Sequence, residues 1–370
     1  MFADAFRDKT VWVSGHTGFK GSWLTQWLLE LGARVTGFSL PPPTRPALFE
    51  QLELEDRINH QTADVRNLAA VTQSIQTAQP DYVFHLAAQP LVRLSYEIPV
   101  ETYETNVMGT IHVLEALRTL EKPCMAVFIT SDKCYENREW LYGYREEDAL
   151  GGRDPYSSST GAAEMAVSAW RRSFFLEHPV RIASARAGHV LGGGDWAADR
   201  IVPDCIRALQ QNQHITVRNP ASTRPWQHVL EPLSGYLWLA ALLASPHYAQ
   251  IRPELLCSAF NFGPSHEANR TVRELVREVL KHWPGRSEDR SVAAGAVHEA
   301  GLLKLSTDKA HAMLGWSPTW DFRTTVSQTV DWYRQANATS ESAAIQRMTL
   351  EQIEAYSAAA QQTGAVWSSK

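Results

Sequence analysis

A strand, a glycine-rich turn and a helix near the N-terminus constrain the fold of this chain more than any other feature. Thr10–Ser14 is short, apolar and β-rich, which predicts a buried strand. It runs directly into Gly15-His16-Thr17-Gly18-Phe19-Lys20-Gly21 and then into an amphipathic run at residues 22–31. In such a unit one glycine permits the tight turn, one lets a pyrophosphate approach, and one lets the helix pack on the strand. Because the helix N-terminus also offers N–H donors and a positive dipole end, the unit predicts a dinucleotide site.

Strands and helices alternate through the first half of the chain. The pattern predicts further strands at 34–38, 59–64, 81–86, 125–130 and 180–185, and helices at 68–78, 101–120 and 155–175. This alternation predicts an α/β fold with a Rossmann-type, doubly wound parallel sheet.

We expect two lobes, and the chain of 370 residues is long enough for both. The dinucleotide-binding domain is predicted at 1–190, with segments from about 225–262 crossing back to it. Residues 191–370 are predicted to form mainly a smaller, substrate-binding C-terminal lobe. Helices are expected at 201–210, 233–244, 271–283, 322–334 and 348–361.

Charge, hydropathy and cysteine pattern exclude several classes of protein. The net charge is −5 and the basic residues are scattered, so we expect no nucleic-acid partner. The N-terminus has no signal-peptide pattern and the longest apolar run, 236–244, is too short to span a bilayer, so we expect no membrane association. Four separate cysteines without a CxxC pair favour the cytoplasm and argue against a metal site or a disulfide framework.

The segments expected around a dinucleotide leave two alternatives open. Residues 39–45, about 20 residues past the glycines, contain no carboxylate to bind an adenine ribose, so the choice between NAD and NADP is open. Asp64, at the end of a predicted strand, is a candidate to accept from an adenine amine or, alternatively, to cap the helix Leu68–Ala78. The small residues Ala87 and Ala88 follow another strand and suit a close approach of cofactor to backbone.

Polar side chains stand where open parallel sheets bind their ligands, beyond the carboxyl ends of the strands. Thr130-Ser131-Asp132-Lys133 directly follows the predicted strand 125–130. Tyr156 falls in the first turn of the predicted helix 155–175. We therefore expect both groups near the cofactor, the alternative for Asp132 and Lys133 being a solvated loop pair.

These motifs together resemble the extended short-chain dehydrogenase/reductases and, within them, the CDP-glucose 4,6-dehydratase family. The resemblance spans about residues 8 to 335 and begins with the glycine turn through Trp23 and the proline run at 39–44. Its other blocks are His85-Leu86-Ala87-Ala88-Gln89-Pro90, Thr130-Ser131-Asp132-Lys133-Cys134-Tyr135, Asp154-Pro155-Tyr156-Ser157, Gly192-Gly193-Gly194-Asp195-Trp196 and Arg224-Pro225-Trp226-Gln227-His228-Val229-Leu230-Glu231-Pro232.

The resemblance implies NAD as cofactor and a nucleotide sugar, CDP-glucose being favoured, as substrate. It implies oxidation at sugar carbon 4, loss of water across carbons 5 and 6, and hydride return to carbon 6, giving CDP-4-keto-6-deoxyglucose. A homodimer or homotetramer paired through helices 101–120 and 155–175 is expected. Two alternatives stay open: an epimerase or oxidoreductase acting without water loss, and a catalytically weak binder of NAD or nucleotide sugar.

The resemblance also assigns roles to residues. Tyr156 takes the proton from the carbon-4 hydroxyl, Ser131 orients that hydroxyl, and Asp132 protonates the departing carbon-6 hydroxyl, a group that an epimerase does not need. Lys133 is either the base for the carbon-5 proton or a stabiliser of the developing enolate. The cofactor-binding residues are expected to be Gly15, Thr17, Gly18, Phe19, Lys20, Gly21, Asp64, Val65, Ala87, Ala88, Gln89, Asn106, Thr130, Tyr156 and Thr160. The substrate-binding residues are expected to be Arg186, His189, Trp196, Arg224, Trp226 and His228, with Arg224 facing the pyrophosphate.

Two positions depart from the family pattern. Thr160 stands where the family has a lysine, and His189 where it usually has asparagine. A phenol with a pKa of about 10 is a poor base at neutral pH without a nearby cation. The chain is therefore a natural member with altered chemistry, a binding-competent but catalytically weak member, or an engineered variant. Lys20, otherwise a surface residue, and Lys133 are candidate substitutes for the missing cation.

Overall fold

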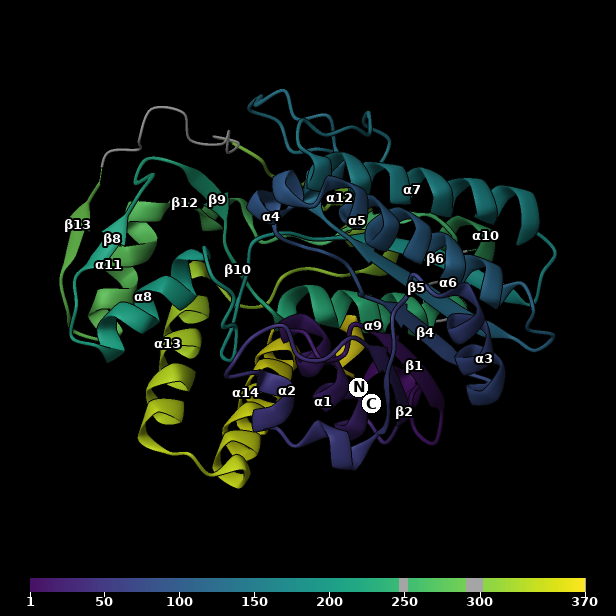
Figure 1. The fold of residues 1–370 in the computed structure, drawn as a ribbon, viewed down its shortest axis with the longest axis horizontal. Coiled ribbons are helices and arrows are strands. Elements are labelled where there is room, and N and C mark those ends of the chain that lie inside the picture. Colours follow the sequence, from purple (N-terminus) through teal and green to yellow (C-terminus); the bar gives the residue numbers. More distant parts are fainter. Residues whose placement is uncertain (246–251, 291–301, 370) are drawn as a thin grey trace.

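The computed structural model describes residues 1–245, 252–290 and 302–369. Its centre is a parallel seven-stranded sheet with the order β11-β6-β5-β4-β1-β2-β3 (Figure 1). The strands are β1 (Thr10–Ser14), β2 (Arg34–Ser39), β3 (Asn59–Thr62), β4 (Tyr82–His85), β5 (Cys124–Thr130), β6 (Val180–Arg186) and β11 (Ala259–Asn261). The strand order reverses between β1 and β4, which makes the end of β1 the topological switch point of the sheet. The predicted α/β, doubly wound fold class is confirmed.

Helices cover both faces of this sheet (Figure 1). One face carries α1 (Phe19–Glu30) and α9 (Leu230–Ala244), with α2 (Leu48–Gln51) and α14 (Ser342–Gln362) packed outside α1. The other carries α3 (Leu68–Ala78), α6 (Gly109–Leu117) and α7 (Pro155–Phe174), with α4 (Val92–Glu97) and α5 (Pro99–Tyr103) beside α7.

The apolar pattern of the strands follows from this double cover. In β1, Val11 and Val13 belong to the hydrophobic cluster under α1 and α9. Trp12, between them, belongs to the cluster under α3 and α6. Successive side chains of a strand point to opposite faces, so a strand buried on both sides must be apolar throughout.

The smaller group of elements lies to one side of the sheet, on the left of Figure 1. It contains α8 (Ile201–Gln210), α11 (Val272–His282) and α13 (Phe322–Ala338), and the two-stranded pairs β7 (Val190–Leu191) with β10 (Gln227–His228), β8 (Ile215–Val217) with β13 (Ser287–Asp289), and β9 (Thr223–Pro225) with β12 (Asn269–Thr271). Short helices complete the fold: η1 (Phe2–Asp4), η2 (Leu54–Arg57), η4 (Asp132–Cys134), α10 (Pro253–Leu256), η6 (His266–Ala268), α12 (Asp308–Leu314) and η7 (Val366–Ser368).

The C-terminal half contributes to both groups. Strand β11 extends the central sheet beside β6, and α9 packs under β5. The last helices return to the first, and the Phe2 ring stacks on Trp367 with centroids 5.0 Å apart. The division of the chain into two domains at residue 190 stays a prediction.

Two helices have the bounds that the sequence predicts. The bounds of α3 and α8 coincide with those predicted. The predicted helix 101–120 is instead α5, a π-helical turn η3 (Glu104–Met108) and α6. Such turns insert one residue into a helix and frequently mark functional sites. Within the described residues, no helix has both the length and the apolar character to cross a membrane.

Candidate active site

The glycine turn has the close contacts that its sequence predicts. Gly15 has a φ of 73°, and a Cβ on it would lie 2.7 Å from the Ala87 nitrogen. A Cβ on Gly21 would lie 2.1 Å from the Gly15 oxygen. Gly18 is the N-cap of α1 and supplies no side-chain cap, so the first N–H groups of α1 are not occupied by a capping side chain. The turn therefore fits the phosphates of a dinucleotide.

Side-chain hydrogen bonds join this turn to the neighbouring strand ends. The Thr17 hydroxyl donates to the Leu40 oxygen at 2.9 Å and bonds the Ser39 hydroxyl at 2.8 Å, which ties the turn to β2. Ser14 Oγ accepts from the N–H of Ala87 at 3.2 Å, which ties β1 to the end of β4. Ala87 therefore lies beside the glycines as predicted, with Ala88 next to it and exposed.

Gln89 and Asn106 shape this edge. The Asn106 Oδ1 accepts from the Gln89 N–H at 2.8 Å, and its Nδ2 donates to the Gln89 oxygen and to Ser159 Oγ. The Gln89 amide is engaged with Leu91 and Thr102. Both side chains are buried and hydrogen-bonded within the protein, and their contact with a cofactor stays a prediction. Asn106 lies in η3, so the π-helical turn has a positioning role here.

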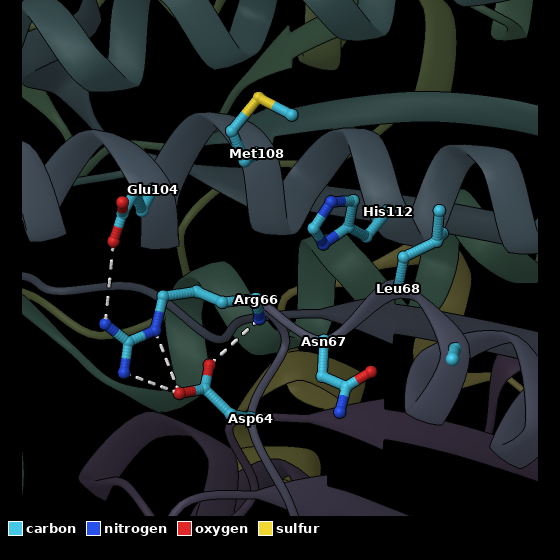
Figure 2. A pocket seen from close by; sticks show the side chains of 8 residues that line it. Asp64, Arg66, Asn67, Leu68, Glu104, Met108 and His112 are labelled. Atoms are coloured by element: carbon cyan, nitrogen blue, oxygen red, sulfur yellow. Dashed lines mark hydrogen bonds and ion pairs between the residues drawn. The ribbon is translucent and has the colours of Figure 1, made fainter.

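Asp64 lies in a cavity of about 710 Å³ at the end of β3 (Figure 2). Its carboxylate accepts from the backbone N–H of Arg66 at 2.9 Å and from its guanidinium at 2.8 Å and 2.6 Å. Burial acts to raise the pKa of Asp64, but the hydrogen bonds and charge of Arg66 outweigh it and lower the pKa.

The helix-cap alternative for Asp64 is wrong, because Asn67 caps α3 by accepting from the Ala70 N–H at 3.1 Å. The cavity is lined by Asp64, Arg66, Asn67, Leu68, Ala69, Glu104, Met108 and His112.

The catalytic candidates converge at the ends of β5 and α7. Asp154 caps α7 by accepting from the Ser157 N–H at 2.9 Å, which sets Tyr156 in the first turn. The Tyr156 N–H donates to Ser95 Oγ at 3.1 Å. Its phenol is buried, and the Ser131 side chain acts on it to lower its pKa. The two residues expected to bind one substrate hydroxyl therefore lie together.

Asp132 follows Ser131 and is almost completely buried. Ser131 Oγ donates to Asp132 Oδ1 at 3.0 Å and accepts from the Lys133 N–H at 3.2 Å, which caps the short helix η4. Asp132 is 1% exposed, so the solvated-loop alternative is wrong for this residue. Lys133 stays partly exposed.

Some of the groups around Tyr156 oppose the ionisation of its phenol and others favour it. Burial raises the pKa of the Tyr156 phenol to about 12, the Ser131 hydrogen bond lowers it, the Asp132 charge raises it and the Arg200 charge lowers it. At neutral pH the phenol is therefore protonated. The cation that acts on it is Arg200, which is held by an ion pair to Asp195 at 2.9 Å.

Lys20 lies inside the site, so the surface alternative for it is wrong. Its Nζ is 3.4 Å from the Tyr236 hydroxyl and 5.7 Å from the centre of that ring. Burial, with the nearby Arg200 charge, lowers the pKa of Lys20 to about 8, against the opposing effect of Asp132. Phe19, just before it, is half-buried at the start of α1.

Two threonines expected to contact the cofactor use their hydroxyls elsewhere. Thr160 Oγ1 donates to the Ser157 oxygen of its own helix at 2.8 Å. Thr130 Oγ1 donates to Glu164 at 2.6 Å. Their contact with a cofactor stays a prediction, and Thr160 brings no charge to Tyr156. Val65, also expected at the cofactor, is buried, and its oxygen lies 2.9 Å from His112 Nδ1.

Arg186 belongs to the core. Its guanidinium pairs with Glu164 at 2.9 Å and donates to the Tyr135 hydroxyl at 2.7 Å and the Glu146 oxygen at 3.0 Å. Its side chain is 4% exposed and that of Glu164 is 2% exposed. These contacts favour a structural role for Arg186, and its contact with substrate stays an untested prediction. The pair joins β6 to α7 beneath the catalytic residues.

His228 is also a core residue. Its ring is fully buried, with centroids 5.9 Å from Trp23 and 4.9 Å from Trp320. Its Nδ1 accepts from the Leu230 N–H at 3.3 Å. Burial lowers its pKa to about 3, so the ring is neutral. Burial favours a structural role for His228, and its contact with substrate stays an untested prediction.

The other expected substrate residues lie nearer the site and stay predictions. The Trp226 indole packs edge-on against His189 with centroids 5.9 Å apart and donates to the Arg270 oxygen at 2.9 Å. Arg224 is partly exposed and its charge acts on His189. Trp196 is half-buried and donates to Gln51 at 3.2 Å.

Known proteins resemble this chain in sequence and in fold. A family model described as GDP-mannose 4,6 dehydratase matches residues 12–329. The chain belongs to this family. Of the curated members, the CDP-glucose 4,6-dehydratase of Salmonella typhimurium is 47% identical over 334 residues, which cover 89% of this chain and 91% of the relative.

Solved structures of this dehydratase family and its neighbours share the fold. A dTDP-glucose 4,6-dehydratase of Streptomyces venezuelae, solved with NAD, has a TM-score of 0.74 at 20% identity, covering 89% of this chain and 98% of that one. A UDP-glucuronic acid 4-epimerase of Bacillus cereus, solved with UDP-glucuronic acid and NAD, has a TM-score of 0.74 at 20% identity, covering 88% and 99%.

Arg200 is the functional candidate that the sequence analysis of this family member missed. It is the N-cap residue of α8, and a cation there is unfavourable to the helix dipole. An arginine at a helix start, directly after the family segment that ends in Asp195-Trp196, is the signal that was available. Its side chain forms an ion pair with Asp195, which precedes the helix.

The assignment of Arg186 can be tested by stability. Arg186→Met leaves the Glu164 carboxylate buried without its partner, so we expect about 3–5 kcal/mol of destabilisation in chemical denaturation. The double variant Arg186→Met/Glu164→Gln should recover much of that loss, because no buried charge remains. Unchanged stability with a selective loss of nucleotide-sugar affinity would contradict the structural role.

Proposed function

We propose that this protein is an NAD-dependent CDP-glucose 4,6-dehydratase that forms CDP-4-keto-6-deoxyglucose. The identity of the substrate's nucleobase is inferred from the curated relative, which is 47% identical over nearly the whole chain. The reaction is chosen from the site, because Tyr156, Ser131 and Asp132 lie together at the end of β5.

The position of Asp132 is the observation that carries the reaction type. An epimerase or a simple oxidoreductase needs a group to move the proton of the carbon-4 hydroxyl, which Tyr156 supplies. Neither needs a buried acid next to that group. Loss of the carbon-6 hydroxyl as water does need one, because hydroxide is a poor leaving group unless it is protonated as the bond breaks. The Ser131 bond to Asp132 joins the two functions in one site.

The residues present fit NAD. The turn at Gly15 and Gly21 has no room for a Cβ, and the Gly18 N-cap leaves the start of α1 open to phosphate. We propose that Asp64, at the end of β3, binds the adenine and that Gly15, Gly18 and Ala87 line the pyrophosphate and nicotinamide path. Bound NAD supplies the hydride acceptor for carbon-4 oxidation and the hydride donor for carbon 6.

Tyr156 and Ser131 handle the first proton. We propose that Ser131 accepts or donates at the carbon-4 hydroxyl and that Tyr156 Oη removes its proton. Because burial holds the phenol protonated at neutral pH, this step needs a cation. In this chain Arg200, rather than the earlier candidates Lys20 and Lys133, supplies the positive charge that the family's lysine would supply.

Asp132 and Lys133 serve the elimination. The Asp132 carboxyl protonates the carbon-6 hydroxyl, and Lys133 either removes the carbon-5 proton or stabilises the enolate that forms. Lys133 is attached to Ser131 through its backbone, so it moves with the acid. On the opposite side, we propose that Arg224 binds the pyrophosphate and that Trp196 and Trp226 line the nucleotide-sugar site.

The reaction can be tested by product mass. Purified protein incubated with CDP-glucose should yield a product lighter by one water, and Tyr156→Phe and Asp132→Asn should each lower the rate by about 100-fold or more. Assays with the glucose esters of other nucleotides test the choice of base. An isomer of unchanged mass would support epimerisation instead, and binding without any product would support the weak-binder alternative.

The role of Arg200 can be tested by the pH dependence of carbon-4 oxidation. Arg200→Met should slow this step at neutral pH by about 10-fold, and raising the pH should restore it, because removing a cation raises the phenol pKa further. Thr160→Lys should accelerate the step and reduce its dependence on Arg200. The control is Arg207→Met, which removes a similar ion-paired arginine from the same helix. Equal rates in Arg200→Met and wild type would contradict the role.

We propose that two copies pair through α5, η3, α6 and α7. The exposed apolar side chains there include Val100, Tyr103, Met108 and Met165. The Tyr103 hydroxyl bonds Ser158 Oγ at 2.6 Å, which places α5 on the stripe of α7 that also carries Met165, seven residues on.

Light scattering after size-exclusion chromatography tests this pairing. We expect a dimer or a tetramer for the wild type, and Val100→Asp/Met165→Asp should halve the mass. Leu141→Asp, an equally exposed apolar position in a loop, is the control and should leave the mass unchanged. A monomeric wild type, or an unchanged mass in the double variant, would contradict this interface.

For location we propose the cytoplasm. The cysteines Cys124, Cys134, Cys205 and Cys257 are all unpaired thiols. Chains with several reduced, largely buried thiols are typical of reducing compartments.

A further inference from the structure

The loop after β6 lies directly on the Asp132 carboxylate. A Cβ on Gly188 would lie 2.1 Å from the Asp132 Cγ, so no other residue fits at this point. His189 follows with a φ of 51°, a backbone conformation that residues other than glycine adopt at a cost. The strained backbone turns its ring to the acid, and His189 Nε2 lies 3.5 Å from Asp132 Oδ2.

The Asp132 carboxylate is satisfied on one side only. Oδ1 accepts from Ser131 Oγ at 3.0 Å. Oδ2 is buried, and among the described residues it has no hydrogen-bond partner. A buried oxygen without a donor is costly unless a proton or a ligand completes it. The nearby group able to exchange a proton with Oδ2 is the His189 imidazole, which is why the pair can act as a unit.

The Asp132 and His189 side chains differ in their exposure to solvent. The Asp132 side chain is 2% exposed, whereas that of His189 is 19% exposed. In the proposed reaction Asp132 gives up a proton in each turnover, and solvent cannot return it directly to a carboxylate buried this deeply. His189, whose Nε2 lies 3.5 Å from Oδ2, is the more exposed of the two side chains.

The charges and rings that face His189 come from several elements. Burial lowers the pKa of His189 to about 4, Asp132 raises it, and Arg224, Lys133 and Arg200 lower it. Trp226 packs against the ring edge-on at 5.9 Å. The imidazole is therefore neutral at rest. The Asp132 charge is the one effect among these that favours a proton on the ring, and it acts across 3.5 Å.

We propose that His189 is a proton relay that returns the proton to Asp132 after each loss of water. The inference rests on the proposed dehydratase function and deepens it. As the carbon-6 to oxygen bond breaks, the Asp132 O–H bond breaks and its proton goes to the leaving hydroxyl, which departs as water. The imidazole then takes a proton from solvent, and its Nε2–H passes that proton to Oδ2, which restores the carboxylic acid and the neutral ring.

His189→Asn tests the relay, because the family's asparagine keeps polarity at this position but does not titrate. We expect kcat at pH 7.5 to fall by about 10-fold or more, with the absorbance change of carbon-4 oxidation in a single turnover unaltered. Lowering the pH or adding free imidazole should restore part of the lost rate. His311→Asn, which changes an exposed histidine bonded to Ser317, is the control and should match the wild type.

Two further measurements exclude a merely structural effect. Thermal unfolding and NAD binding of His189→Asn should match the wild type closely enough to show a folded, loaded site. In an Asp132→Asn background, His189→Asn should cost little more, since a relay has no function without its acceptor. Equal kcat and equal pH profile in His189→Asn and wild type would overturn the relay. A wild type that forms no dehydrated product would overturn the proposed function itself.

Discussion

The burial of the Tyr156 phenol next to the Asp132 carboxylate sets the electrostatic problem that the rest of the site has to solve. Tyr156 must lose a proton, and a negative charge on Asp132 raises its pKa. In the proposed elimination Asp132 gives a proton to the leaving hydroxyl, and its side chain is almost completely buried. The two demands agree: when Asp132 is a neutral acid, the obstacle to ionising Tyr156 is smaller. A histidine that restores the acid therefore serves the oxidation as well as the elimination.

The fold places these groups by joining strand ends at the switch point of a parallel sheet. Contacts at Gly15 bring the end of β1 against the end of β4, while β5 and α7 supply the acid and the phenol from the neighbouring edge. Beneath them the buried Arg186–Glu164 pair joins β6 to α7. Above them, Gly188 lets the loop after β6 close on Asp132. The chemistry is thus held by close packing on three sides and is open on the side of His189 and Arg224.

The parts of this account that depend on local pattern could be predicted from the sequence. The glycine turn, the parallel order and the bounds of α3 and α8 follow from periodicity and capping, and the convergence of Tyr156 with Ser131 follows from strand ends meeting at one edge. The parts that depend on distant partners could not. From the sequence, Arg186 is interpreted as a ligand-binding arginine, because its buried partner Glu164 is distant along the chain. The proposed role of Arg200 depends on Asp195 and Tyr156, and Tyr156 lies near it only in the folded protein.

Isotope tracing tests the central claim that one site oxidises carbon 4, removes water and completes the reaction without releasing the sugar. CDP-glucose carrying deuterium at carbon 4 should give CDP-4-keto-6-deoxyglucose with that deuterium at carbon 6. Unlabelled substrate in deuterium oxide should give solvent deuterium at carbon 5. A product without deuterium at carbon 6, or with the label still at carbon 4, would contradict the account.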